Sequence, residues 1–266
     1  MSTALQGIVA PRVGAERAIS LLTLALLLAL WTLLAASGRF NPIFIPSPAA
    51  VWQAFVDALL QGYQGAFLHE HILASLKRVL AGYGLALAIG IPLGLVMGLS
   101  RHVRAVFDPL IEFYRPLPPL GLYTLLVMWL GIGDSSKIAL LALAGLPALT
   151  LSSMQAVRGI DPQLLKAARS LGAGRLRLFF TVVLPASLPG ICTGMRIGLG
   201  FTYTVLVAAE IVAASAGIGW MIWDASKFLL TPVVVMGLVV MGATGWLLDA
   251  AVRLLERHLT AWRFIR

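Results

Sequence analysis

The chain has 266 residues, of which 59% are hydrophobic and only 12% charged, and its mean hydropathy is +0.92. This balance excludes an ordinary soluble globular domain and indicates a membrane protein. The formal net charge of +9 does not require a nucleic acid partner, because basic loops on the inner side of a membrane contact anionic lipid head groups.

Apolar segments of about 20 residues, long enough at the helical rise to cross a bilayer, recur along the chain. They predict six spans, at 18–37, 79–99, 117–132, 138–157, 188–214 and 233–254. The third segment is short, and the fifth contains an Arg and a Glu. A signal peptide is an alternative for the first segment, although its apolar run exceeds the usual length of such a core. We therefore expect an all-α membrane protein with six transmembrane helices.

The positions of Lys and Arg predict the orientation of these spans. With a cytoplasmic N-terminus, the inner segments carry Arg12, Arg17, Arg101, Arg104, Arg115, Arg158, Lys166, Arg169, Arg175, Arg177, Arg253, Arg257, Arg263 and Arg266. The outer segments carry only Arg39, Lys77, Arg78, Lys137 and Lys227. Both termini are thus predicted to be cytoplasmic, as tails 1–17 and 255–266 around a transmembrane domain at 18–254.

The first outer loop, 38–74, contains a helix signal at Ser47 and Pro48, followed by an apolar face with Trp52 as an expected membrane-interface anchor. His69, Glu70 and His71 follow it, but their spacing does not place two imidazoles on one helix face as a zinc protease requires. They are predicted to be solvated. We find no Gly-rich phosphate loop and no nucleophile elbow, so we expect neither an enzyme nor a metal site.

Glycine occurs at every fourth position in two predicted spans, at 90, 94 and 98 and at 190, 194 and 198. Because close packing drives helix association in lipid, both runs predict close helix contacts within the subunit.

Arg196 and Glu210 are the ionisable groups expected at membrane depth. A charge at the centre of a transmembrane helix costs about 2.5–3.5 kcal/mol, so each should have a partner or a wet cavity. Arg196, Tyr203 and Glu210 lie on nearly one helical face. We hypothesise that this face borders a translocation path. The alternatives are that Arg196 reaches the inner head groups and that Glu210 bonds a neighbouring helix.

The segment 161–189 is strongly basic and lies between two long apolar runs. Asp161 and Pro162 are typical of a helix start, and Gly172 of a helix end. Between them one face carries Leu164, Leu165, Ala168 and Leu171, with Lys166 and Arg169 outside that stripe. The segment is predicted to face water and contact a partner; a merely interfacial amphipathic helix is the alternative.

The same segment resembles the signature loop of ABC importer permeases, which reads Glu-Ala-Ala, three residues, Gly, nine residues, an aliphatic, any residue, then Leu-Pro. The matching residues here are Ala167, Ala168, Gly172, Val182, Leu184 and Pro185, with Lys166 where the family usually has Glu. The resemblance implies a type I importer fold and a coupling loop at 158–185 that docks on an ATP-binding subunit. It also implies a multi-pass protein of the bacterial inner membrane.

Further stretches resemble the taurine, alkanesulfonate, nitrate and cyanate branch of these permeases, at 76–79, 108–120, 129–137 and 207–210, and taurine permeases in particular at 193–200. The implied partners are a second permease copy, two cytoplasmic ATP-binding subunits and a periplasmic substrate-binding protein, besides membrane lipid. ATP and Mg would be bound by the partner subunit and no cofactor by this chain. The implied solute is taurine or a related sulfonate, with nitrate, cyanate or another small organic anion as the alternative. An ion-coupled secondary transporter is a rival class, but no duplicated halves are found.

Overall fold

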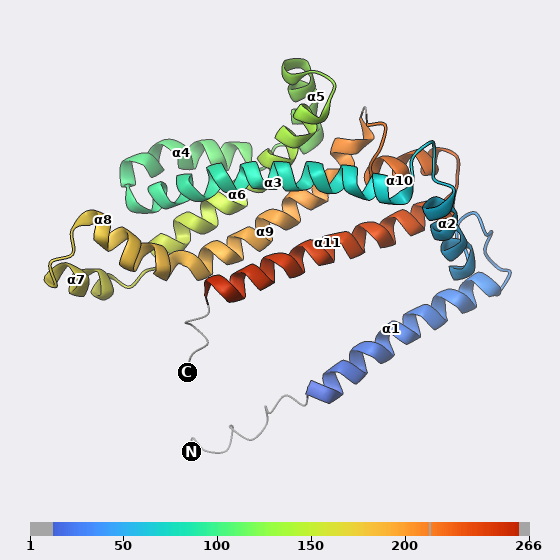
Figure 1. Cartoon of the computed structure of the whole chain (residues 1–266), viewed down its shortest axis with the longest axis horizontal. Helices are drawn as coiled ribbons and strands as arrows, with labels where there is room; N and C mark the ends of the chain where they lie inside the picture. Colours follow the sequence, from blue (N-terminus) through green and yellow to red (C-terminus); the bar gives the residue numbers. More distant parts are fainter. Residues whose placement is uncertain (1–12, 213, 261–266) are drawn as a thin grey trace.

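The computed structural model describes residues 13–212 and 214–260, and the regular structure within these ranges is helical. The elements are α1 (Val13–Ala36), α2 (Pro48–Leu60), α3 (Leu68–Leu99), α4 (Arg101–Tyr114), α5 (Pro119–Leu130), α6 (Asp134–Arg158), α7 (Pro162–Ser170), α8 (Arg175–Leu178), the π-helix η1 (Phe179–Val183), α9 (Leu184–Ile211), α10 (Ile218–Lys227) and α11 (Thr231–Leu259). The long helices run along the longest axis of the molecule (Figure 1). The expected all-α fold is confirmed.

Helix α6 is the centre of the bundle, because glycine-bearing faces of α3 and α9 both pack on it. A Cβ added at Gly94 of α3 would lie 2.6 Å from the Cβ of Ser153. A Cβ added at Gly190 of α9 would lie 2.6 Å from the Cβ of Ala156. Both predicted glycine runs therefore make the close contacts within the chain that their spacing indicates.

A second apolar core joins α2, α10 and α11 at one end of the bundle. The Ser47 hydroxyl accepts a hydrogen bond from the Ala50 N–H at 3.2 Å, and Pro48 occupies the first turn of α2, so this helix begins where the sequence predicts. Val51 and Ala54 are buried in this core, whereas Trp52 is exposed. The position of Trp52 is compatible with an interface anchor, a role that stays a prediction.

Helix α1 lies apart from the bundle and joins it beside α2 (Figure 1). Its apolar side chains are exposed along the candidate span Ala18–Ala36, and the Trp31 Nε1–H donates to the Pro46 carbonyl at 3.0 Å. At the other end of the chain, α11 continues to Leu259, into the segment 255–266 that was predicted as a tail. Most of the predicted N-terminal tail, residues 1–12, lies outside the described residues.

Five helical stretches in the described part of the chain are long and apolar enough to cross a membrane. They are Ala18–Ala36, Leu68–Leu99, Asp134–Arg158, Arg175–Ile211 and Thr231–Leu259. The predicted third span corresponds to α5, which has only 12 residues. At the helical rise this is about 18 Å, shorter than the roughly 30 Å of a bilayer core. The count of six spans therefore stays a prediction.

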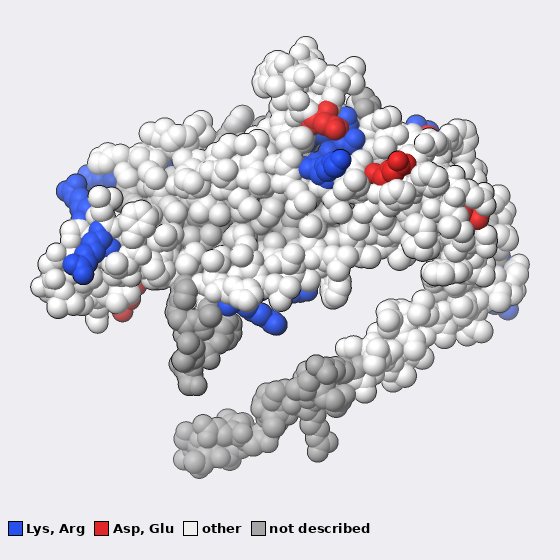
Figure 2. Space-filling view, viewed as in Figure 1, with Lys and Arg blue, Asp and Glu red and all other residues white. Residues whose placement is uncertain are grey.

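On the face drawn in Figure 2 the charged side chains lie in separate groups. Figure 2 shows Lys and Arg at the end formed by α7 and α8, and a mixed group of both signs below α5. The broad stretch of this face between the two groups is uncharged, as the surface of a membrane-embedded bundle requires.

Candidate functional site

Helix α7 is a short exposed helix with both of its predicted end signals in place. The Asp161 side chain accepts a hydrogen bond from the Gln163 N–H at 2.8 Å and caps the first turn. At the other end Gly172 has φ +81°, and the Ala173 N–H bonds the Ala168 carbonyl at 3.1 Å. This is a Schellman ending, which needs a residue in the left-handed region and therefore favours glycine. The sequence signals determine the length of α7.

The predicted apolar stripe of α7 is divided between the bundle and solvent. Leu165 and Ala168 are half-buried, and Leu165 packs against the main core. Leu164 and Leu171 are exposed, Leu171 to 88%. Lys166, Ala167 and Arg169 are also exposed. The helix thus presents leucines together with cations, which suits an apolar groove with acidic surroundings on another protein.

The Leu-Pro pair of the signature lies where α7 and α8 connect to the long helix α9. Pro185 has no N–H to donate, and its ring would collide with the carbonyl four residues earlier in a regular helix. The chain forms the π-helix η1 just before it, and the Leu184 N–H bonds the Phe179 carbonyl. The proline therefore accounts for a locally widened helix at the junction between the exposed loop and the bundle.

Arg196, Tyr203 and Glu210 all have partners within the chain. The Arg196 Nε–H donates to Asp249 Oδ1 of α11 at 3.1 Å, although the Arg196 side chain is 43% exposed. The Tyr203 hydroxyl donates to the Met241 carbonyl of α11 at 2.8 Å. Glu210 is fully buried. Their proposed position beside the path stays a prediction, and for Glu210 the structure supports the alternative of a bond to a neighbouring helix.

Glu210 belongs to a buried ionic cluster between α3, α6, α9 and α10. Its carboxylate accepts hydrogen bonds at 2.8 Å from Ser75 Oγ, Arg78 Nη1 and the Gly219 N–H. Arg78 also donates to Asp134 Oδ1 at 2.8 Å and to the Ala216 carbonyl at 2.7 Å. The carboxylate and guanidinium are therefore paired and hydrogen-bonded, as buried charges must be.

This cluster holds the segment before α10 against α3. Ser75 Oγ accepts from the Ile218 N–H at 2.8 Å while donating to Glu210, so one hydroxyl links two elements. Gly217 has φ +142° and lies against the Glu210 carboxyl, where a Cβ would have no space. Tyr123 of α5 donates to the Val212 carbonyl at 3.0 Å. The end of α9 is thus fastened to three neighbouring helices.

The prediction that His69, Glu70 and His71 are all solvated is wrong for His71. The His71 ring is fully buried: Nδ1 accepts from the Gly217 N–H at 3.1 Å and Nε2 donates to the Tyr63 carbonyl at 3.2 Å. It also stacks on Trp220 with centroids 5.7 Å apart. This burial was not evident from the sequence, because Gly217 and Trp220 lie far along the chain from His71.

The neighbouring groups have simpler roles. His69 and Glu70 are exposed, and Glu70 accepts from the Phe67 N–H at the start of α3. Burial and a hydrogen bond to Asp224 raise the pKa of Tyr63 to about 12, so its hydroxyl stays a donor at physiological pH. Among the described residues no group of His, Cys, Asp and Glu is arranged to hold a metal.

A cavity of about 590 Å³ opens beside α6 and α9, on a different face of α9 from Arg196 and Glu210. Ile197, Phe201 and Val205 line it from α9. Helix α6 contributes residues from Leu140 to Gln155. Residues 114–119, from the end of α4 through the Pro-rich connection to the start of α5, also line the cavity. The cavity therefore runs along much of the central helix and is large enough for a small ligand.

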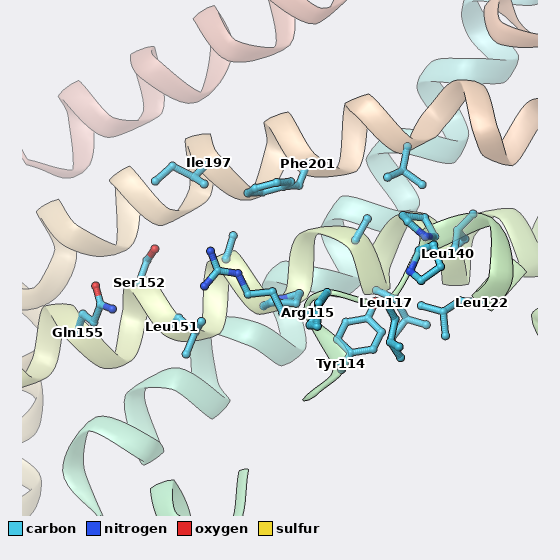
Figure 3. Close-up of a pocket in the computed structure, with 18 residues that line it drawn as sticks. Tyr114, Arg115, Leu117, Leu122, Leu140, Leu151, Ser152, Gln155, Ile197 and Phe201 are labelled. Atoms are coloured by element: carbon cyan, nitrogen blue, oxygen red, sulfur yellow. The ribbon is translucent and has the colours of Figure 1, made fainter. Parts of the chain in front are cut away.

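The lining of this cavity is apolar over most of its length and polar at one end. Ser152 and Gln155 lie one turn apart on α6 toward the α7 end of the bundle, and Arg115 is the lining residue with a formal charge. Figure 3 shows the Arg115 side chain directed along the cavity toward the end where Ser152 and Gln155 lie. Arg115 was predicted to lie in an inner loop, and its place in the cavity was not predicted. The Pro-rich run that follows it was the available signal, since prolines hold a short connection in a defined path.

Residues 90–261 match the family model described as binding-protein-dependent transport system inner membrane component. Over 245 residues the chain is 42% identical to the taurine transport system permease protein TauC of Escherichia coli (strain K12), covering 92% of this chain and 89% of that protein. It is 33% identical to the putative aliphatic sulfonates transport permease protein SsuC of Bacillus subtilis (strain 168), covering 91% of this chain and 87% of that protein.

A solved structure has a similar fold. A chain of the MetNI methionine ABC transporter, in an inward-facing conformation, superposes with a TM-score of 0.65 at 20% sequence identity. The match covers 73% of this chain and 96% of that chain. At this identity the likeness establishes the fold and nothing about the solute.

Proposed function

Because the chain belongs to the binding-protein-dependent transport system inner membrane component family, and is thus a permease subunit of an ABC importer, we propose that it transports taurine or a related small sulfonate. The resemblance to the taurine and sulfonate branch is confirmed by relatives of both kinds. The single observation that supports the solute class is the 42% identity to a taurine permease along 92% of this chain.

The solute path is proposed to include the cavity beside α6. It borders the apolar face of α9 with Ile197, Phe201 and Val205, and it continues to the end of the bundle from which α7 projects. The face with Arg196, Tyr203 and Glu210 was the earlier candidate. We prefer the cavity because these three side chains are engaged with α11, α3 and α10.

The family implies ATP-binding subunits and a substrate-binding protein as partners. We propose that α7 and its flanking residues 158–185 dock on the ATP-binding subunit, because Leu164, Leu171 and the cations of α7 are exposed together on one short helix at the end of the bundle. If α5 is also a span, as the six-span prediction requires, this docking would place both chain termini in the cytoplasm. ATP and Mg would then be held by the partner, and its closure would move α7 and shift the permease between inward-facing and outward-facing states.

A second copy of this chain and membrane lipid are proposed to cover the remaining apolar surfaces. The side chains of α1 are exposed along its candidate span, and Met128, Trp129 and Ile132 at the end of α5 are each more than 70% exposed. Such areas are stable only in contact with hydrocarbon or protein.

The test is uptake by the complete complex in liposomes, with the binding protein outside and ATP inside. We expect binding-protein-dependent accumulation of radiolabelled taurine and ethanesulfonate, together with stimulated ATP hydrolysis. Accumulation of nitrate or cyanate but of neither sulfonate would refute the proposed solute and leave the importer assignment intact. Uptake by the permease alone, driven by a proton gradient, would contradict the docking proposal.

A further inference from the structure

We propose that Arg115 is the anion-binding residue of the cavity, which contacts the sulfonate group of a passing solute through its guanidinium. This inference rests on the proposed function, because it concerns the same cavity and the same class of solute. Beyond the proposed function, the inference names the residue that binds the solute and the sulfonate group that this residue contacts. It also says that the permease does not recognise the amine of the solute.

The position of Arg115 is fixed by the local sequence. It caps the C-terminal end of α4, and Pro116, Pro118 and Pro119 follow it with only Leu117 between them. Proline fixes φ and restricts the residue before it, so this connection has little backbone freedom. The base of the Arg115 side chain is therefore held at the wall of the cavity, with the guanidinium directed along it (Figure 3).

The charge of Arg115 is available to a ligand. Within the described part of the chain its guanidinium has no carboxylate partner, in contrast to Arg78, Arg196 and Arg253, which all form ion pairs. None of the residues that line the cavity is an Asp or Glu. Arg115 is exposed where it lines the cavity, so its guanidinium is open to an anion that enters.

The chemistry of the surrounding groups fits an oxyanion. A guanidinium presents paired N–H donors that bind two oxygens of a sulfonate or similar group at once. The Ser152 hydroxyl and the Gln155 amide, one turn apart on α6, add donors at the same end of the cavity. The opposite end, around Leu122 and Leu140, is apolar.

The same lining predicts what the permease does not recognise. An ammonium group such as that of taurine would be recognised by a carboxylate, and the lining contains none. We therefore infer that the permease recognises the acidic end of its solute and ignores the amine. Taurine and ethanesulfonate should then depend equally on Arg115, and any discrimination between them belongs to the binding protein.

The decisive experiment compares R115Q with wild type in the reconstituted complex at saturating binding protein. We expect R115Q to reduce uptake of both taurine and ethanesulfonate by about tenfold, the loss expected from one charge-assisted hydrogen bond. Assembly with the ATP-binding subunit and basal ATP hydrolysis should not change. R101Q is the matched control, because Arg101 is an exposed arginine of the same helix that does not line the cavity.

A cysteine variant separates charge from folding. In this chain the native Cys192 is buried, so R115C provides an accessible thiol in the cavity. Modification of R115C with a cationic aminoethyl methanethiosulfonate should restore uptake, and modification with the anionic sulfonatoethyl reagent should not. Equal effects of both reagents, or wild-type uptake by R115Q, would overturn the proposal.

An anionic lipid head group offers the same chemistry as the solute and must be distinguished from it. The R115Q comparison is therefore made in liposomes of phosphatidylcholine alone and of phosphatidylcholine with phosphatidylglycerol. A defect of equal size in both supports solute binding, and a defect confined to the anionic liposomes would overturn it in favour of a lipid contact. If wild type transports neither sulfonate, the proposed function fails first; if it transports both and R115Q is unaffected, only this inference fails.

Discussion

The buried ion pair between Arg78 and Glu210 gives the sharpest prediction for stability. The Glu210 carboxylate is fully buried and accepts hydrogen bonds from Arg78, Ser75 and the Gly219 N–H. Arg78→Met would leave this carboxylate without a countercharge in a site that water does not reach. Breaking a buried pair by removing one partner costs about 3–5 kcal/mol. We therefore expect R78M to lower the free energy of unfolding by that amount.

Glu210→Ala should cost about as much by a different route. It removes the acceptor of the Gly219 N–H and of the Ser75 hydroxyl, and each unsatisfied buried group costs about 1–3 kcal/mol. Arg78 would retain Asp134, whose side chain is 61% exposed, so its charge would not be wholly unpaired. The segment before α10 should loosen first, because Ala216 and Ile218 are held by the same cluster.

The assay is reversible unfolding of the purified permease in mixed detergent micelles, followed by Trp fluorescence and circular dichroism. Trp220 stacks on His71 close to the cluster and provides a local reporter. Arg196→Gln is the matched control: its ion pair with Asp249 is partly exposed, in contrast to the buried Glu210, and should contribute only about 0.2–1 kcal/mol.

A double-mutant cycle tests the reasoning itself. If Arg78 and Glu210 stabilise one another, the loss in the double variant must be smaller than the sum of the single losses, by about 0.5–3 kcal/mol for groups in contact. Additive losses, or an R78M variant no less stable than R196Q, would refute the argument that burial makes this pair important.

Two further predictions concern glycines with different structural roles. Gly172→Val should detach the ATP-binding subunit or uncouple its ATP hydrolysis while the bundle stays folded, because a β-branched residue does not adopt the φ of +81° that ends α7. Normal stimulation of ATP hydrolysis by the loaded binding protein would count against docking through α7. Gly94→Val should destabilise the bundle by about 1–3 kcal/mol or more, because its side chain would meet the backbone of α6. Gly84 lies on the same helix with open space around it, so Gly84→Val should change the free energy of unfolding little in the same assay.

Much of the fold could be predicted from local patterns. Runs of apolar residues identified the long helices, because a helix that crosses the hydrocarbon core of a bilayer needs one continuous apolar stretch, whichever helices pack beside it. Ser47 and Asp161 marked helix starts and Gly172 a helix end, because caps depend on residues next to the helix. The glycine runs correctly indicated close contacts, although the partner, α6 in both cases, was not evident from them.

The prediction was weaker where a residue's role depends on distant partners. His71 was expected in solvent and is buried against Gly217, which lies 146 positions along the chain. The predicted third span corresponds to the shorter α5, because Pro118 and Pro119 begin the helix late and Gly131 ends it early. Arg115 was assigned to an inner loop, and only the packing of α4, α5 and α6 places it in a cavity.

The amino-acid sequence by itself determined that this chain is a helical membrane protein, where α2 begins and α7 begins and ends, and which short loop carries the family signature. These properties depend on hydropathy, capping and backbone freedom, which act between residues near one another in the chain. Only the tertiary structure decided that Glu210 pairs with Arg78 and that Arg115 stands in a cavity without a countercharge. Charges in a membrane protein acquire their roles from the helices that surround them, and that arrangement is set by packing over the whole chain.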